Sequence, residues 1–209
     1  MECGAVSTRR GRPTRSLEDI RLMREKVAQA AALLFRDEGY ASVSMRRLAR
    51  EVGCTPMTLY AYFDSKADIL SHLWEGVYGD LFADLTRLAR EIEDPALRLG
   101  AVANHYVDFW VRHPELYRLV FMTEGVSQSE VSAFLTSSGA VERHQLFNGL
   151  VSEVLGHPSE PVLKRRTEAL LCGLAGIAHC HVTISGYPWS APDILVAEIL
   201  ASLVGEPDR

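Results

Sequence analysis

The sequence predicts an all-α fold of about nine helices. Apolar residues recur at steps of three and four along almost the whole chain, whereas the strict alternation that marks a strand is absent. Capping residues, glycines and prolines separate these segments at the places where helices start and stop. With 209 residues, 47% of them hydrophobic and 23% charged, the chain is long and apolar enough to bury a core.

The first helix is predicted over residues 17–38. Ser16 and Asp19 have the spacing of a capping box, in which each side chain satisfies a free backbone amide of the other residue. Gly39 is a natural left-handed stop. One face is apolar and carries Ile20, Met23, Val27, Ala30, Ala31 and Leu34.

Two short helices separated by a glycine turn are predicted next. Ser44 caps the first and Gly53 ends it, and Thr55 caps the second, with Pro56 in the first turn. Their inner faces carry Leu48, Ala49 and Val52, then Leu59, Tyr60 and Phe63. This arrangement is typical of a helix-turn-helix, whose second helix enters the major groove of DNA.

The rest of the chain is predicted to form longer helices. Asp64-Ser65 caps the fourth helix, and Asp94-Pro95 opens the fifth, which breaks at His113-Pro114. Later helices are expected over residues 116–121, 129–155, 161–185 and 192–204, and the second of these is either continuous or broken near Ser137-Ser138-Gly139. We divide the chain into a flexible basic arm (1–16), a helix-turn-helix domain (17–66) and a helical-bundle body (67–209), with the seam inside the fourth helix.

Charge is distributed unevenly between these parts. The chain carries a formal net charge of −5, but residues 1–66 hold 12 Lys+Arg against 8 Asp+Glu, and the remainder holds 10 against 19. A basic first third on an acidic body indicates that one end of the molecule meets phosphate.

The segment 43–66 resembles the DNA-binding segment of TetR/AcrR-type regulators. The resemblance extends over about residues 20–70 and rests on Ser44, Val52-Gly53-Cys54-Thr55, Leu59-Tyr60, Tyr62-Phe63, Lys66 and Leu70. It implies an N-terminal three-helix DNA-binding domain and a C-terminal domain for ligand binding and dimerisation. It also implies a repressor that binds a palindromic operator as a homodimer and is released by a small-molecule inducer. A transcriptional activator and a non-inducible DNA-binding protein remain as alternatives.

The resemblance also implies particular DNA contacts. Phosphate contacts are expected from Ser44, Thr55, Tyr60, Tyr62 and Lys66, and base contacts from Pro56, Met57 and Thr58. Met57 stands where the family often has glycine, and its side chain can contact a thymine methyl but cannot donate a hydrogen bond. Cys54 replaces the usual turn valine, which leaves either a small buried hydrophobe or a redox role.

The arm holds four arginines within residues 9–15, with Gly11 and Pro13 between them. Arg12, at its centre, is expected to bind DNA, because extended Arg-rich segments suit the narrow minor groove. The alternative is a solvated tail that adds only non-specific attraction.

Two surfaces of the body are candidates for further binding. Small residues permit close packing against a second copy or inside one monomer, and the candidate dimer interface comprises Ala169, Cys172, Gly173, Gly176, Cys180, Leu195 and Ile199. Aromatic and polar residues of the fifth and sixth helices form either a ligand pocket or ordinary core, and these are His105, Phe109, Trp110, Tyr117, Phe121 and Met122.

Other classes of function find no support. The sequence lacks the nucleophile-elbow, phosphate-loop, dinucleotide-binding and zinc-protease motifs, so we expect no enzyme and no cofactor. His179 and His181 are two residues apart and lie on different helix faces, so we expect no metal. The four cysteines, Cys3, Cys54, Cys172 and Cys180, lack metal-site spacing and are expected to be free. Without a signal or a membrane span, a cytoplasmic, nucleoid-associated protein is expected.

Overall fold

The computed structural model describes residues 16–135 and 138–205, which form ten α-helices and no strand. The helices are α1 (Leu17–Glu38), α2 (Met45–Val52), α3 (Pro56–Tyr60), α4 (Lys66–Glu91), α5 (Pro95–Arg112), α6 (Pro114–Phe121), α7 (Gln128–Leu135), α8 (Ser138–Val154), α9 (Glu160–Thr183) and α10 (Pro192–Gly205). The predicted all-α class is confirmed. The count rises to ten because the helix expected over 129–155 does break, between α7 and α8.

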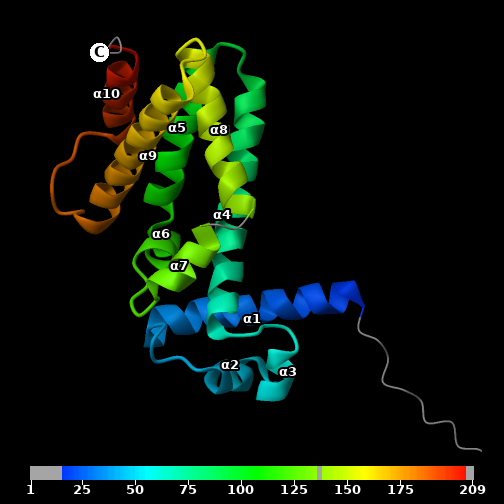
Figure 1. Ribbon diagram of the computed structural model, residues 1–209. Coiled ribbons are helices and arrows are strands. Elements are labelled where there is room, and N and C mark those ends of the chain that lie inside the picture. Colours follow the sequence, from blue (N-terminus) through cyan, green and yellow to red (C-terminus); the bar gives the residue numbers. More distant parts are fainter. Residues whose placement is uncertain (1–15, 136–137, 206–209) are drawn as a thin grey trace, which may run out of the picture.

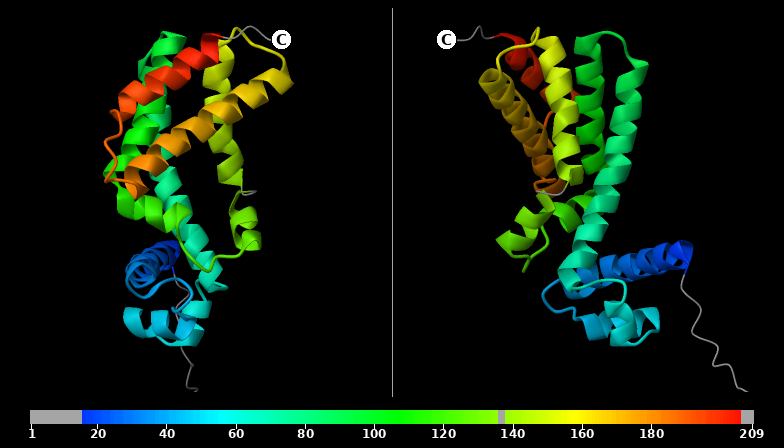
Figure 2. Two further views of the ribbon diagram at one scale, coloured as in Figure 1. Left: turned by 90° about the vertical axis from the view of Figure 1, so that its left-hand side faces the viewer. Right: turned by 45° about the vertical axis from the view of Figure 1, so that its right-hand side comes forward.

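The helices form two parts that share α4 (Figure 1). At one end, α2 and α3 lie beneath α1, and α1 crosses the start of α4. At the other end, α5 and α8 pack beside the second half of α4, and α9 and α10 pack on the other side of α5 (Figures 1 and 2). The short α6 and α7 lie between the two parts, and α6 packs against α1.

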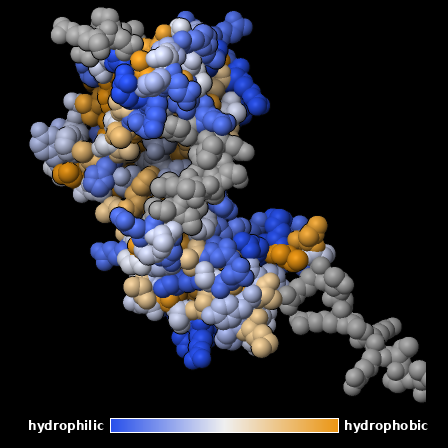
Figure 3. All heavy atoms as spheres, in the orientation of Figure 1, coloured by the Kyte–Doolittle hydropathy of each residue, from blue (hydrophilic) through white to orange (hydrophobic). Residues whose placement is uncertain are grey.

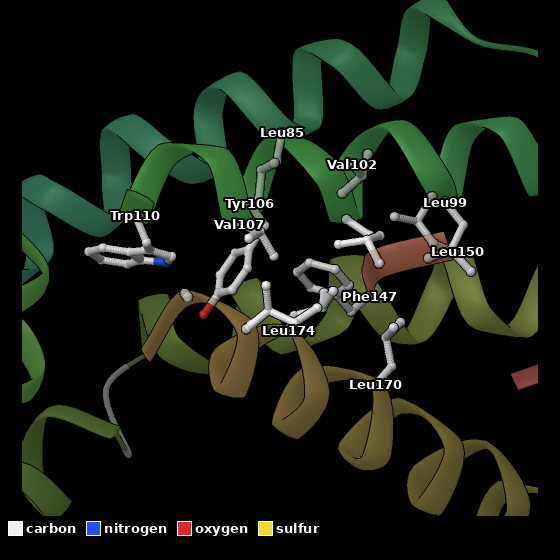
Figure 4. Packing of buried hydrophobic residues seen from close by; sticks show 14 of the residues in the cluster. Leu85, Leu99, Val102, Tyr106, Val107, Trp110, Phe147, Leu150, Leu170 and Leu174 are labelled. Atoms are coloured by element: carbon white, nitrogen blue, oxygen red, sulfur yellow. The ribbon is translucent and has the colours of Figure 1, made fainter. Parts of the chain in front are cut away.

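Each part has its own hydrophobic cluster. The smaller cluster includes Leu48, Leu59, Phe63, Ile69 and Trp74, which are almost completely buried. The larger cluster fills the bundle, where residues of α5, α8 and α9 converge (Figure 4), among them Leu99, Trp110, Phe147, Leu170 and Leu174. Because α4 contributes to both clusters, no flexible linker separates the two parts.

Local sequence signals set the ends of the first helices. The Ser16 hydroxyl accepts from the Asp19 amide at 3.0 Å, and Asp19 accepts from the Ser16 amide at 3.1 Å, which completes the predicted capping box. Ser44, Thr55 and Ser65 cap α2, α3 and α4 in the same way, each through its hydroxyl.

A pair of glycine substitutions tests whether backbone conformation decides these helix ends. A side-chain carbon added at Gly53, where φ is +76°, would have no other atom within 4 Å. A side-chain carbon added at Gly76, inside α4, would also have no other atom within 4 Å. Gly53→Ala should lower the free energy of unfolding by about 1 kcal/mol, because alanine disfavours positive φ. Gly76→Ala should raise it by roughly 0.5–1 kcal/mol through helix propensity. Chemical denaturation measures both changes, and equal effects would contradict this explanation of the turn.

Candidate nucleic-acid interface

The turn between α2 and α3 is built around Gly53. Its backbone is left-handed, at φ 76° and ψ 35°, and its amide bonds the carbonyls near the end of α2. The Cys54 amide then donates to the Ala49 carbonyl at 2.9 Å. This closed turn lets α3 start directly at Thr55-Pro56, as a helix-turn-helix requires.

One side of α3 is anchored in the core and the other is exposed. Leu59 is fully buried, while the Met57 side chain is 84% exposed and Tyr60 is 51% exposed. Pro56 and Ala61 are also exposed, and Thr58 and Tyr62 are partly buried. The predicted base-contacting residues Pro56 and Met57 are therefore presented to solvent by an anchored helix.

The capping hydroxyls lie at the same end of the molecule. Ser44 Oγ accepts from the Arg47 amide at 3.2 Å, and both caps are exposed. Thr55 Oγ1 accepts from the Thr58 amide at 3.1 Å and lies 2.9 Å from the Thr58 hydroxyl. The first-turn amides of α2 that Ser44 leaves unbonded point away from the helix, the arrangement that suits a phosphate.

Two basic residues of α1 hold α2 and α3 in place, a role that the sequence pattern does not reveal. Arg24 Nη1 donates to the Tyr62 carbonyl at 2.5 Å, and its guanidinium lies 4.1 Å from the Phe63 ring centre. Lys26 Nζ donates to the Val52 carbonyl at 2.9 Å. Both cations satisfy carbonyls near helix C-termini, where positive charge is favourable.

The arginines of α2 divide into two kinds. Arg47 forms ion pairs with Glu38 at 2.8 Å and Glu51 at 2.6 Å. Arg46 and Arg50 are exposed and have no ion pair within the described part of the chain. The cations of α2 that are available for phosphate are therefore Arg46 and Arg50. Arg12 and the other arginines of the arm lie outside the described residues.

Lys66, an expected phosphate contact, is the first residue of α4. Its Nζ donates to the Tyr40 carbonyl at 2.5 Å and lies 4.0 Å from the centre of the Tyr40 ring. Partial burial lowers the pKa of Lys66, and the nearby carboxylate of Glu130 acts in the opposite direction. The side chain is thus held beside the loop that connects α1 to α2.

The proposed pocket residues do not all come together. Trp110 is fully buried and lies within 6 Å of Phe109, Tyr117 and Phe121, measured between ring centres. His105 instead lines a surface hollow of about 350 Å³ with Asn104, Asp108, Pro192 and others. Met122 is 44% exposed.

The aromatic group retains polar atoms. Tyr117 Oη lies 3.0 Å from His179 Nδ1, which closes one side of the group. Trp110 Nε1 is also buried, and its side chain lies beside Tyr106, with 6.3 Å between ring centres, and interacts with it.

The proposed interface residues fall into two sets. A side-chain carbon on Gly173 would lie 2.7 Å from Ile199 Cδ1, so this glycine permits close packing of α9 on α10 within one chain. Ala169, Cys172 and Gly176 form an exposed stripe on α9, and Cys180 and Leu195 are partly buried.

No metal-binding group of three or more His, Cys, Asp or Glu occurs in residues 16–135 and 138–205. The two ring nitrogens of His181 lie 2.8 Å and 3.1 Å from the carbonyls of Ile177 and Ser190. Cys54, Cys172 and Cys180 are free thiols. None of the described helices is long and apolar enough to cross a membrane.

Comparisons with known proteins agree with this geometry. Residues 28–73 match the family described as bacterial regulatory proteins, tetR family. The chain is 28% identical over 104 residues to the HTH-type transcriptional activator FasR of Mycolicibacterium smegmatis, covering 50% of this chain and 48% of FasR. It is 32% identical over 98 residues to the nucleoid occlusion factor SlmA of Vibrio cholerae, covering 46% and 50%. The chain thus spans about half the length of the curated relatives it matches.

The whole fold also occurs in solved structures. The transcriptional regulator FadR of Bacillus subtilis, in complex with stearoyl-CoA, superposes with a TM-score of 0.67 at 17% identity, covering 87% of this chain and 97% of FadR. The DNA-binding segment of the chain over residues 28–73 is thus that of the tetR family of bacterial regulatory proteins, and 87% of the chain shares the all-helical fold of FadR.

Proposed function

We propose that this regulator is a ligand-responsive repressor that binds a palindromic operator as a homodimer and is released by a small-molecule inducer. The observation that carries the proposal is the exposed edge of α3, where Met57 is 84% exposed on a helix anchored by the fully buried Leu59. A rigid helix that presents its first turn to solvent suits insertion into the major groove.

The surface around α3 supports contacts with the DNA backbone. Ser44 and Thr55 place hydroxyls at helix starts, and Arg46 and Arg50 add exposed charge on α2. Lys66 opens α4, the next helix along the chain. Backbone contacts of this kind fix the register of the protein on the duplex, while the side chains of residues 56–58 read the bases.

The exposed stripe of α9 supports pairing with a second copy. Ala169, Cys172 and Gly176 are small, so a partner helix can approach closely, and Ile194 on the neighbouring α10 is 55% exposed. Apolar residues come to the surface on the side where α9 and α10 lie (Figure 3). A two-fold dimer would place two copies of α3 about 34–36 Å apart, one turn of DNA.

The aromatic group of α5 and α6 supports a ligand site. Trp110 Nε1 and Tyr117 Oη place polar atoms among the apolar rings, and a ligand site needs a few such groups in an apolar lining. Phe121 is 44% exposed at the edge of the group. FadR, which shares the fold, holds stearoyl-CoA in its solved structure, so a small molecule in this kind of bundle is a reasonable inducer.

An inducer must bind the DNA-competent and the DNA-incompetent shapes unequally. Because α4 belongs to both parts, we infer that binding changes the separation of the two α3 helices through α4. Activation is the second candidate, because the relative FasR carries the name of an activator. The sign of regulation depends on where the operator lies relative to the promoter, and both signs use the same DNA-binding surface.

Selection of bound duplexes from a random pool at moderate salt tests the proposal. The expected result is enrichment of a palindrome, because a two-fold dimer reads two equivalent half-sites. Binding only at low salt, with no enriched sequence, would show that the basic end is a non-specific anchor and would overturn the proposal.

Two substitutions separate backbone contacts from base contacts. Lys66→Ala should weaken binding to all duplexes and lower the salt dependence by about one counterion per lost contact. Met57→Ala should instead change base preference within the half-site by roughly 1–3 kcal/mol and leave the salt dependence unchanged. Fluorescence anisotropy over a salt series, with the selected and with scrambled duplexes, measures both, and the reverse pattern would refute the assignment.

A bulky residue on the α9 stripe tests the dimer. Gly176→Arg should convert the dimer to monomer, because the exposed Gly176 has open space in one chain but would face a partner helix. Gly149→Arg on α8 is the matched control, since Gly149 is also exposed with open space. Sedimentation velocity reads the mass of each variant. A Gly176→Arg protein that stays dimeric would place the interface elsewhere.

A further inference from the structure

The loop between α1 and α2, residues 39–44, is contacted by the segment that leads into α7. The Tyr40 hydroxyl donates to Glu130 Oε1 at 3.0 Å. Gly125 approaches the same loop so closely that a side-chain carbon there would lie 3.0 Å from the Ala41 Cβ. In Figure 1, α7 lies at the level where the bundle meets the DNA-binding end of the molecule. The body of the molecule therefore contacts the DNA-binding domain at a defined point, 90 residues away in sequence.

Glu130 is held in place by its own loop. Its Oε2 accepts from the Ser127 amide at 2.6 Å and from the Ser127 hydroxyl at 2.7 Å. These bonds, with smaller contributions from Tyr40 and Lys66, lower the pKa of Glu130. The carboxylate is consequently charged at neutral pH and is a strong, fixed acceptor for the Tyr40 hydroxyl.

Tyr40 joins this carboxylate to Lys66. The Tyr40 side chain is only 4% exposed and packs edge-to-face on Phe35, with 5.0 Å between ring centres. Its ring lies 4.0 Å from Lys66 Nζ, and its carbonyl accepts from the same atom at 2.5 Å. The position of the tyrosine therefore decides where the ammonium group lies.

The ammonium group remains able to bind a further anion. It has three N–H donors, and the Tyr40 carbonyl takes one of them. Among the described residues Lys66 forms no ion pair within 4.0 Å. A phosphate can therefore use the remaining donors while Tyr40 keeps the side chain in a single place.

We propose that Tyr40 and Glu130 are positioning residues for DNA binding: Glu130 on α7 fixes Tyr40, and Tyr40 holds Lys66 ready for a phosphate. The inference rests on the proposed function, because it takes Lys66 to be a phosphate contact. Preorganisation of this kind raises affinity by removing the cost of ordering a long side chain upon binding.

The same contacts give the body a means of regulating DNA binding. Phe134, also on α7, packs against Trp74 of α4 with 5.0 Å between ring centres. Trp74 Nε1 donates to the Leu119 carbonyl of α6 at 3.1 Å. A change in the body that moves α6 and α7 would withdraw Glu130 from Tyr40 and release Lys66.

Tyr40→Phe and Glu130→Ala test the proposal, with Glu124→Ala as control. Tyr40→Phe keeps the ring under Lys66 but removes the hydroxyl that Glu130 holds. Glu124 is an exposed carboxylate of the same segment, and the carboxylate that the Tyr40 hydroxyl bonds is that of Glu130. Glu124→Ala therefore removes the same negative charge as Glu130→Ala but leaves the bond to Tyr40 in place. Anisotropy titrations over a salt series use the operator from the selection experiment and an unrelated duplex, with the active fraction and Tm measured for each variant.

We expect Tyr40→Phe and Glu130→Ala each to weaken binding to both duplexes by roughly 3- to 10-fold, because losing the bond removes the preorganisation of Lys66 but leaves Lys66 itself in place. The ratio between the two duplexes should stay constant, and Glu124→Ala should bind no more weakly than wild type. In a Lys66→Ala background, Tyr40→Phe should have no further effect, because its only route to DNA is through Lys66.

Two results would overturn the inference while leaving the proposed function intact. One is binding by Tyr40→Phe and Glu130→Ala equal to that of Glu124→Ala, while Lys66→Ala is weakened. The other is an undiminished Tyr40→Phe effect in the Lys66→Ala background, which would mark a purely structural role. Wild-type protein that binds neither duplex would overturn the proposed function, and the inference with it.

Discussion

The continuity of α4 is the constraint on which the rest of the structure depends. Ile69, Leu70 and Trp74 in its first half are buried in the small cluster, and Leu81 and Leu85 in its second half are buried in the large one. A 26-residue helix spans about 39 Å and does not bend freely. Any tilt of this helix in the bundle must therefore shift α1 to α3 as well, and the contacts of α6 and α7 with α1, α4 and the loop at Tyr40 limit the shift.

The basic charge of the DNA-binding part serves two purposes that compete for the same residues. Arg24 and Lys26 bond carbonyls at the ends of α3 and α2, and Arg47 is paired with two glutamates. These cations orient the helix-turn-helix and cannot all meet phosphate at the same time. The net charge of residues 1–66 consequently overestimates the number of cations available for DNA. Binding to phosphate then depends mainly on Arg46, Arg50, Lys66 and the arginines of the arm.

The fold could be predicted largely because its helix ends are locally encoded. Ser16, Ser44, Thr55 and Ser65 cap their own helices through bonds over three residues, so spacing alone reveals them. The exposed first turn of α3 could be predicted from the helical spacing of its apolar residues. The break between α7 and α8 was visible as Ser137-Ser138-Gly139, but serine and glycine are weak signals inside an apolar pattern.

Side-chain contacts between distant elements could not be predicted in this way. His105 and Trp110 are close in sequence, yet five residues turn a helix by about 140° beyond a full turn, so they face different surroundings. The close approach of Gly173 to Ile199 depends on how α10 packs, so the small residues on α9 indicated close packing but not whether the neighbour is the same chain or a second copy. The contact between Tyr40 and Glu130 could not be predicted from the spacing of apolar residues, because that spacing identifies the buried face of each helix and not a polar contact between two distant segments.

The energy scale of the Glu130–Tyr40 contact is suited to regulation. A hydrogen bond to a charged group contributes about 1.5–3 kcal/mol, and couplings between effector and ligand sites are typically about 1–3 kcal/mol. The expected 3- to 10-fold loss of operator affinity corresponds to about 0.7–1.4 kcal/mol for the proposed dimer, because only part of the energy of each bond reaches the DNA through Lys66. An inducer therefore need not unfold or separate the two parts of the chain. It need only bind more tightly to a body in which α7 has moved away from the loop that holds Lys66.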